Sequence, residues 1–189
     1  MQVTEIRKLY LDCAKMDSMR VRVCGWVRTV RDGKNFAFME ISDGTYFKTA
    51  QLVMEATLEN YKEITSLNVG AAVYAEGTLV YTPENKQPFE VKADKMEVAA
   101  PSAPAYPLQK KRHTLEYLRE IAHLRPRANT FQAVFRIRSV AAQGIHSFFA
   151  ERGFVYVNTP IITCSDCEGA GEMFRITTLD PLNPPTTQE

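Results

Sequence analysis

Residues 163–174 (TCSDCEGAGEMF) concentrate the residue types that most often do chemistry in proteins. The stretch holds a Cys-x-x-Cys pair (Cys164 and Cys167), two glutamates (Glu168 and Glu172) and a Gly-Ala-Gly. Four kinds of site could be built from these residues: a metal knuckle, a redox dithiol, a phosphate-binding loop, or a loop that covers a small substrate.

The spacing argues against the first three kinds of site. A structural zinc site takes about four ligands, usually from two such pairs, and the other two cysteines lie far away in the N-terminal half. Nothing around the pair supports a thioredoxin-like dithiol, and neither phosphate-loop pattern is present. We therefore expect no metal site and favour a substrate-side loop, in which glycines let the backbone curve tightly. Glu168, with Ser165 and Glu172 beside it, offers a carboxylate for a substrate ammonium group.

Five β-rich segments lie upstream of this stretch, and they predict a small barrel. Alternating apolar and polar residues predict strands over 21–30, 36–41, 49–55, 71–82 and 89–98, with a bulge or close approach at Gly77 and a helix over 57–67. Three strands, a helix and two strands are the element order of an OB-fold, a five-stranded barrel that binds oligonucleotides across strands 2 and 3. A purely structural barrel and a different all-β module remain open.

The composition is that of a soluble globular protein. The chain has 189 residues, 45% of them hydrophobic and 24% charged, and no apolar run approaches the roughly 20 residues of a membrane span. Its start shows no secretory signal, and four scattered cysteines favour a reducing compartment, so we expect a cytoplasmic location. A net charge of +1 argues against wholesale electrostatic capture of nucleic acid.

A proline-rich linker and two helices are predicted after the barrel. Residues 99–107 contain three prolines, and residues 110–138 carry eight basic and two acidic side chains, which indicates either a solvated face or a phosphate-facing surface. Thr114 caps a predicted helix over 115–124.

A longer helix follows from residue 129 or 130 and ends at Gly153. It is followed by a β-rich segment, 154–163, whose proline predicts an edge or bent strand. The long helix carries a stripe of Phe131, Val134, Phe135, Arg138, Ala141, Ala142, Ile145, Phe148 and Phe149.

The order of helix, Gly153, Phe154 and Pro160 resembles motif 1 of the class II aminoacyl-tRNA synthetases, and SDCEGAGEMF (165–174) looks like the asparaginyl version of the segment that follows it. An OB-fold before a class II core is typical of the aspartyl, asparaginyl and lysyl subgroup. The resemblance implies a β plus α+β fold: a five-stranded OB-fold barrel followed by the start of a class II catalytic domain. It divides the chain into an N-terminal extension (1–18), an anticodon-binding barrel (19–100), a linker (101–126) and the start of the catalytic domain (127–189).

The same resemblance assigns roles to four barrel residues. Phe38 is expected to stack on an anticodon base, Gln51 to contact the central uracil, Glu90 to contact the first anticodon base, and Arg31 to touch the anticodon. Each role suits the side chain, since a phenyl ring stacks on any base and a carboxamide both donates and accepts. The structural alternatives are a core position for Phe38, a solvated one for Gln51 and cross-strand pairing for Glu90.

The implied activity is that of an asparagine–tRNA ligase, which joins asparagine to ATP with Mg²⁺ and then to tRNA(Asn). Glu168 would contact the amino acid, and a homodimer would form through Phe131, Val134, Phe135 and Pro160. The arginines of motifs 2 and 3 do not occur in the sequence, so the catalytic residues are unknown, and we expect an N-terminal fragment that is inactive alone and binds no cofactor. Alternatives are a stand-alone tRNA- or single-strand-binding OB-fold protein, an aspartyl or lysyl relative, and a β-module used for dimerisation.

Overall fold

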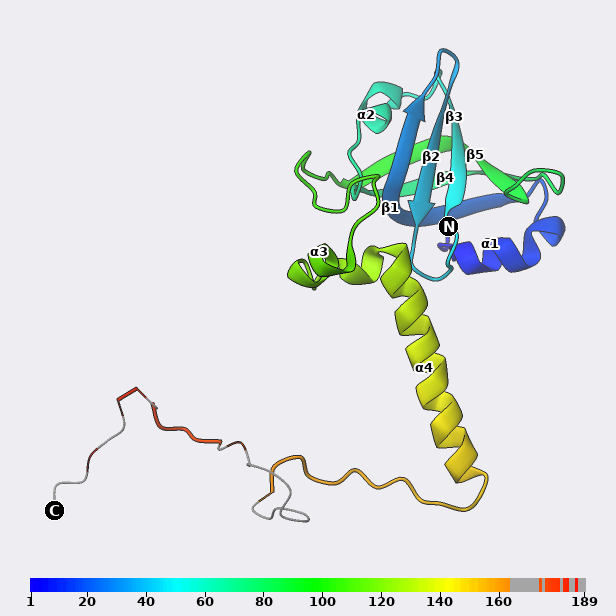
Figure 1. Cartoon of the computed structure of the whole chain (residues 1–189). Coiled ribbons are helices and arrows are strands. Elements are labelled where there is room, and N and C mark those ends of the chain that lie inside the picture. Colours follow the sequence, from blue (N-terminus) through cyan, green and yellow to red (C-terminus); the bar gives the residue numbers. More distant parts are fainter. Residues whose placement is uncertain (164–173, 175, 181, 184–185, 187–189) are drawn as a thin grey trace. The chain divides into compact units, whose positions relative to one another are not determined.

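The computed structural model describes residues 1–163, 174, 176–180, 182–183 and 186 (Figure 1). The chain divides into two compact units, Met1–Ala142 and Gln143–Glu189, which are described separately. The elements in chain order are α1 (Ile6–Asp12), η1 (Cys13–Lys15), β1 (Arg20–Asp32), β2 (Phe36–Ser42), β3 (Ala50–Glu55), α2 (Tyr61–Thr65), β4 (Ala72–Tyr81), β5 (Phe89–Ala100), α3 (Leu115–Glu120), η2 (Arg125–Arg127) and α4 (Asn129–Ala150).

The five strands form a closed barrel in the order β1-β2-β3-β5-β4, which confirms the predicted OB-fold. The pairs are antiparallel except for β3 with β5, which run parallel through Leu52 opposite Val91. Strand β1 pairs with β4 along its first half and with β2 along its second, and the register shifts between Val27 and Thr29. Such a shift bends a strand, so β1 can pair with β4 and with β2 and thereby close the barrel.

The barrel core is built by alternation along the strands. In β2, Ala37, Met39 and Ile41 are fully buried, while the residues between them face outward. The core also takes in Ile6 and Leu9 of α1, both fully buried. The N-terminal extension is therefore packed into the barrel core, although the predicted domain boundaries stay a prediction.

Gly77 lies where β4 and β5 approach each other too closely for a side chain. The register of the pair shifts between Glu76 and Gly77, and a Cβ at position 77 would collide with the backbone of Lys92 and Ala93. The structure thus confirms the bulge and close approach predicted there, because only glycine leaves room for the neighbouring strand.

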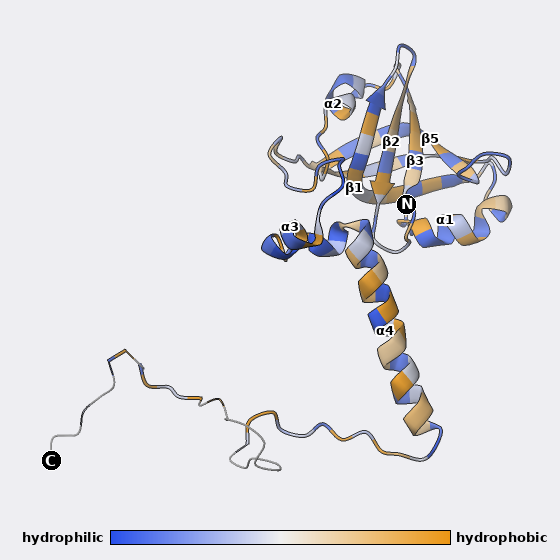
Figure 2. Ribbon diagram, in the orientation of Figure 1, coloured by the Kyte–Doolittle hydropathy of each residue, from blue (hydrophilic) through white to orange (hydrophobic). Residues whose placement is uncertain are grey.

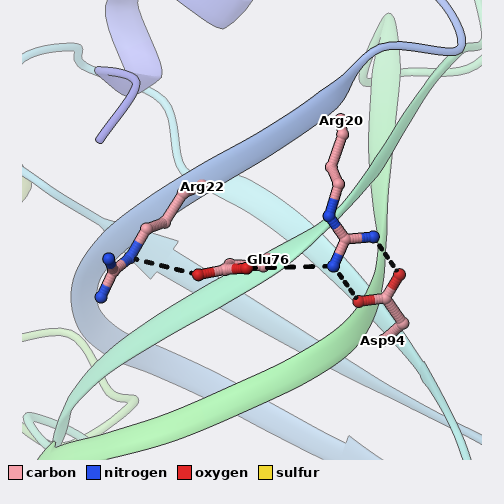
Figure 3. Close-up of polar contacts among 4 residues, drawn as sticks. All are labelled: Arg20, Arg22, Glu76 and Asp94. Atoms are coloured by element: carbon pink, nitrogen blue, oxygen red, sulfur yellow. Dashed lines mark hydrogen bonds and ion pairs between the residues drawn. The ribbon is translucent and has the colours of Figure 1, made fainter. Parts of the chain in front are cut away.

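A charged network ties three strands together on the barrel surface (Figure 3). The guanidinium of Arg20 on β1 donates two hydrogen bonds, of 2.7 and 2.8 Å, to the carboxylate of Asp94 on β5. Glu76 on β4 lies 3.6 Å from Arg22 Nε and 3.9 Å from Arg20. Both arginines are at least partly exposed to water, so the network adds little to stability.

The linker after β5 lies against the barrel. The Nδ2 of Asn68 donates to the carbonyl of Ser102 over 3.0 Å, and Leu108 is 6% exposed. Thr114 accepts a hydrogen bond from the backbone N–H of Tyr117, as the predicted cap requires. Helices α2 and α3 are shorter than the predicted spans 57–67 and 115–124.

Helix α4 has 22 residues, none of them buried. Figure 2 shows hydrophobic and hydrophilic residues mixed along its exposed surface. Gly153 adopts a φ of 79°, the left-handed conformation predicted for the residue that ends this helix.

The strand predicted over 154–163 is wrong. These residues form no regular secondary structure, and all of them are exposed. Valine, isoleucine and aromatic side chains favour strands, but a strand needs a neighbour to complete its hydrogen bonds.

Candidate nucleic-acid interface

An open groove of about 920 Å³ runs along the outer face of the barrel. Alternation turns Arg31 of β1, Gln51 of β3 and Glu90 of β5 to this face, and all three line the groove. The structure therefore brings together three of the four side chains predicted to contact the anticodon. The other lining residues are Tyr10, Arg28, Thr29, Glu40, Phe47, Lys48, Thr49, Val69, Asn85, Lys86, Gln87, Leu108, Gln109, Lys110, Lys111 and Asn129.

Gln51 and Glu90 are joined by a short hydrogen bond. The Nε2 of Gln51 donates to Oε1 of Glu90 over 2.6 Å, because the parallel register of β3 and β5 brings these positions side by side. An ionised carboxylate can only accept hydrogen bonds. The pair therefore fixes the amide of Gln51 with its nitrogen toward Glu90 and its oxygen available to a ligand.

Glu40 extends this polar network, and the sequence reasoning missed it. It lies directly opposite Gln51 in the β2–β3 register, 3.4 Å from Arg31 Nη2, and it accepts a hydrogen bond of 3.2 Å from Thr49 Oγ1. The alternation that places Phe38 on the outer face also places Glu40 there, two residues along β2. This alternation was the signal that could have revealed it.

Phe38 lies beside the groove and does not line it. Its side chain is 38% exposed, which excludes the core position considered above. It is the register partner of Arg31 on β1 and of Val53 on β3. The ring thus belongs to the same sheet face as the groove, two residues before Glu40 on β2.

Tyr10, from α1, is the second residue that sequence reasoning missed. Its ring stacks on Tyr46 with centroids 4.6 Å apart, and its hydroxyl donates to the carbonyl of Thr49 over 2.7 Å. Burial raises the pKa of Tyr10 to about 12, and the nearby Tyr46 and Glu40 add to the shift. No signal in the sequence pointed to it, because α1 comes near the groove only in the folded chain.

The basic run over 110–138 is divided between the groove and the packing of the chain. Lys110 and Lys111 line the groove together with Lys48 and Lys86. Arg125 and Arg127 instead lie over aromatic rings, and Arg136 donates to the carbonyl of Gly44 over 2.6 Å. Two lysines of the run thus place positive charge at the groove, as a phosphate-facing surface would.

Arg28 is held where the barrel meets η2 and the start of α4. Its guanidinium donates to the carbonyl of Arg127 over 2.9 Å and lies 3.4 Å from Oδ1 of Asn129. Burial lowers the pKa of Arg28, and the nearby Arg127 also acts in that direction. The side chain lines the groove, and its guanidinium already has hydrogen-bond acceptors in the carbonyl of Arg127 and the amide oxygen of Asn129.

The remaining predicted positions lie outside the groove. Phe131 and Phe135 have ring centroids 5.6 Å apart on α4, while Val134 and Pro160 are exposed. Glu168, with Ser165 and Glu172, lies outside the described residues. Within the described part of the chain, no three His, Cys, Asp or Glu side chains gather as metal ligands would.

Two family models match the chain. One, described as an OB-fold nucleic acid binding domain, covers residues 21–99, and the other, tRNA synthetases class II (D, K and N), covers residues 114–181. Asparagine–tRNA ligases from Clostridium botulinum and Acetivibrio thermocellus are 56% and 58% identical over the whole of this chain. The whole chain is homologous to asparaginyl-tRNA synthetases. It spans 41% of the length of each of these relatives.

Solved structures of this and a neighbouring family share the fold. The Pyrococcus horikoshii asparaginyl-tRNA synthetase complexed with asparaginyl-adenylate aligns with a TM-score of 0.79 at 20% identity, over 90% of this chain and 39% of that one. An aspartyl-tRNA synthetase from Entamoeba histolytica aligns at 0.69 and 18% identity, over 85% of this chain and 39% of that one. Among the described residues, no helix is long and apolar enough to cross a membrane.

Proposed function

We propose that the groove face of the barrel binds the anticodon loop of tRNA(Asn). The observation that carries the proposal is the gathering of Arg31, Gln51 and Glu90 in one groove, with Phe38 on the same sheet face. Stacking on a phenyl ring suits any unpaired base, and the polar side chains beside it can distinguish one base from another. The four lysines around the groove would follow the phosphates.

We further propose that the chain acts as the N-terminal part of an asparagine–tRNA ligase. Such an enzyme joins asparagine to ATP, releases pyrophosphate, and passes the asparaginyl group to tRNA. ATP and Mg²⁺ are reactants of that whole enzyme, and we assign no step through them to this chain. Glu168 is proposed to contact the amino acid, and catalytic residues are not assigned. The family identity supports this role, and the few scattered cysteines support a cytoplasmic location.

A homodimer formed through α4 and the segment after it completes the proposal. Phe131, Val134, Phe135 and Pro160 are the residues proposed for the interface. Its support is that α4 has a stripe of apolar side chains and no buried residue, and a helix of this kind gains stability by packing its stripe against a partner.

The test is binding of an RNA hairpin whose loop carries the anticodon GUU. Phe38→Ala should weaken the affinity by about fivefold or more, because a base stack contributes about 1–3 kcal/mol. Gln51→Ala should weaken it by a similar factor, because it removes the hydrogen bonds that the amide is proposed to make with a base. Fluorescence anisotropy with a labelled hairpin measures the dissociation constant, and circular dichroism checks that both variants fold. Both side chains face outward, so the barrel should stay intact.

A second hairpin, with the same stem and an AAA triplet, gives the control. It should bind more weakly than the GUU hairpin. Equal affinity for both would indicate a single-strand-binding barrel without sequence preference, and unchanged affinity in both variants would refute the assignment of the face.

A further inference from the structure

We propose that Phe47 is a second base-stacking platform, distinct from Phe38, which takes the unpaired RNA base next to the one contacted by Gln51. The inference rests on the proposed RNA-binding function and extends it to a residue in the loop between β2 and β3. Its ligand is a single nucleobase, held by its face.

Phe47 is an apolar ring in a polar groove. It lines the groove with Lys48, Gln87 and Glu90, and 50% of its surface is exposed. Among the described residues no other aromatic ring stacks on it. Single exposed apolar side chains are common, so exposure alone would mean little. What distinguishes Phe47 is that its loop is held in place.

The β2–β3 loop is fastened to α1 at both ends. A fixed loop presents its side chains with less entropy to lose on binding. The fastening consists of hydrogen bonds from Ile6 N to Asp43 Oδ2 (2.8 Å), from Arg7 N to Thr45 Oγ1 (3.1 Å) and from Tyr10 Oη to Thr49 O (2.7 Å), together with the stack of Tyr10 on Tyr46. Phe47 lies between these anchored residues.

The order of residues along β2 separates the two rings. Phe38 comes first, Glu40 follows opposite Gln51, and β2 then ends at Ser42 before the loop that carries Phe47. Two residues along a strand span roughly 7 Å, so Phe38 and the loop lie on opposite sides of the Gln51 position. An RNA strand along this line would meet a ring, then the Gln51–Glu90 pair, then a second ring.

The charges around Phe47 suit a nucleotide. Lys48, the next residue, places Nζ 5.8 Å from the Tyr10 ring centroid, and Lys86 of the β4–β5 loop lines the same groove. A base on the ring of Phe47 would therefore have cations near it for its phosphate. Stacking on an aromatic face with basic groups beside it is the general way in which single strands are bound.

The test combines four variants of the full 189-residue chain, Phe47→Leu, Phe47→Trp, Phe38→Leu and Phe154→Leu, with GUU hairpins in which each loop nucleotide in turn is made abasic. Phe47→Leu keeps an apolar side chain but removes the aromatic face, and Phe47→Trp restores one. Phe154→Leu is the control, because Phe154 is exposed and does not line the groove. Dissociation constants are measured by fluorescence anisotropy.

Phe47→Leu should weaken binding of the intact hairpin by at least about fivefold, whereas Phe47→Trp and Phe154→Leu should leave it unchanged or stronger. With one abasic hairpin, Phe47→Leu should bind as tightly as the unaltered chain, because the base that stacks on Phe47 is absent. The abasic position at which Phe38→Leu loses its effect on affinity should be a different one. An unchanged affinity in Phe47→Leu, a penalty that persists at every abasic position, or a shared position with Phe38 would overturn the inference. If Gln51→Ala still weakens binding in these cases, the inference on Phe47 is wrong but the proposed RNA-binding function is retained. If the unaltered chain does not bind the hairpin, both the proposed function and the inference are wrong.

Discussion

In the groove, one hydrogen bond sets the direction of an amide. Glu90 accepts a hydrogen bond of 2.6 Å from Nε2 of Gln51, so the amide oxygen of Gln51 is left to accept a hydrogen bond from a ligand. The N3 of uracil carries a hydrogen and can donate to that oxygen, whereas the N3 of cytosine is an acceptor. The arrangement would therefore favour uracil over cytosine at the base that Gln51 is proposed to contact.

This preference can be tested with Glu90→Gln. The new amide can donate as well as accept, so Gln51 is free to turn over and offer its nitrogen to a base. We expect the affinity ratio between hairpins with U and with C at the central anticodon position to fall by about fivefold or more, in line with the cost of an unpaired polar group. Anisotropy titrations of both hairpins measure the ratio; an unchanged ratio would show that Glu90 does not orient the amide.

Tyr10 gives a prediction on pH. Its folded-state pKa of about 12 lies above the value near 10 of an unfolded tyrosine, so the neutral phenol is favoured in the fold. The stabilisation is fully present below about pH 10 and is lost as the pH rises toward 12. The difference in unfolding free energy between the unaltered chain and Tyr10→Phe should thus shrink above pH 10. Urea unfolding at a series of pH values measures it, and a constant difference would contradict the assignment.

The side chains on strands could be predicted from the sequence, and those on the loop could not. Arg31, Gln51 and Glu90 occupy outward positions of strands with a clear alternation, so family resemblance and periodicity agreed on them. Phe47 and Tyr10 reach the groove only because α1 packs beside the β2–β3 loop. That contact joins segments some forty residues apart and leaves no periodic trace in the sequence.

At the scale of elements, α1 is a part of the barrel core that the sequence did not reveal. It has seven residues, too few for a convincing helical period, and its two buried side chains are surrounded by charged ones. The strands were predicted well because each repeats its alternation over several residues. The segment 154–163 has the residue types that favour a strand. It forms none because no neighbouring strand in the described part of the chain pairs with its backbone.

The place of α1 in the core can be measured by comparing two leucines of the same helix. Leu9 is fully buried and Leu11 is 66% exposed. Leu9→Ala should lower the free energy of unfolding by about 2–5 kcal/mol, and Leu11→Ala should change it by less than about 0.5 kcal/mol. Urea denaturation followed by circular dichroism measures both. Similar effects of the two substitutions would mean that α1 is not part of the cooperative core.

At the scale of the whole molecule, the exposed stripe of α4 bears on association. Val134 and Ile145 belong to the stripe and are 38% and 61% exposed. We expect the chain to self-associate as its concentration rises, and Val134→Glu combined with Ile145→Glu to keep it monomeric, since charges oppose burial of the stripe. Sedimentation velocity over a concentration series measures the state.

Gln143→Glu is the matched control for this experiment, because position 143 lies on the other side of α4 from Ile145. It adds a negative charge to the same helix without entering the stripe, and self-association should persist. Loss of association in the control as well would point to net charge, and not to the stripe, as the cause.

The parallel pairing of β3 with β5 has a consequence for the nascent polypeptide. Leu52 finds its partner Val91 only after α2 and β4 have been made. Until then the outer edge of β3 carries unmatched backbone groups that can recruit strands from other chains. A ribosome that stalls between the codons for β3 and β5 would release a sheet that is not closed. We expect such truncated products to be degraded by proteases or to aggregate. Synthesis past Ala100 supplies all of β5, so β3 and β5 can pair and close the barrel.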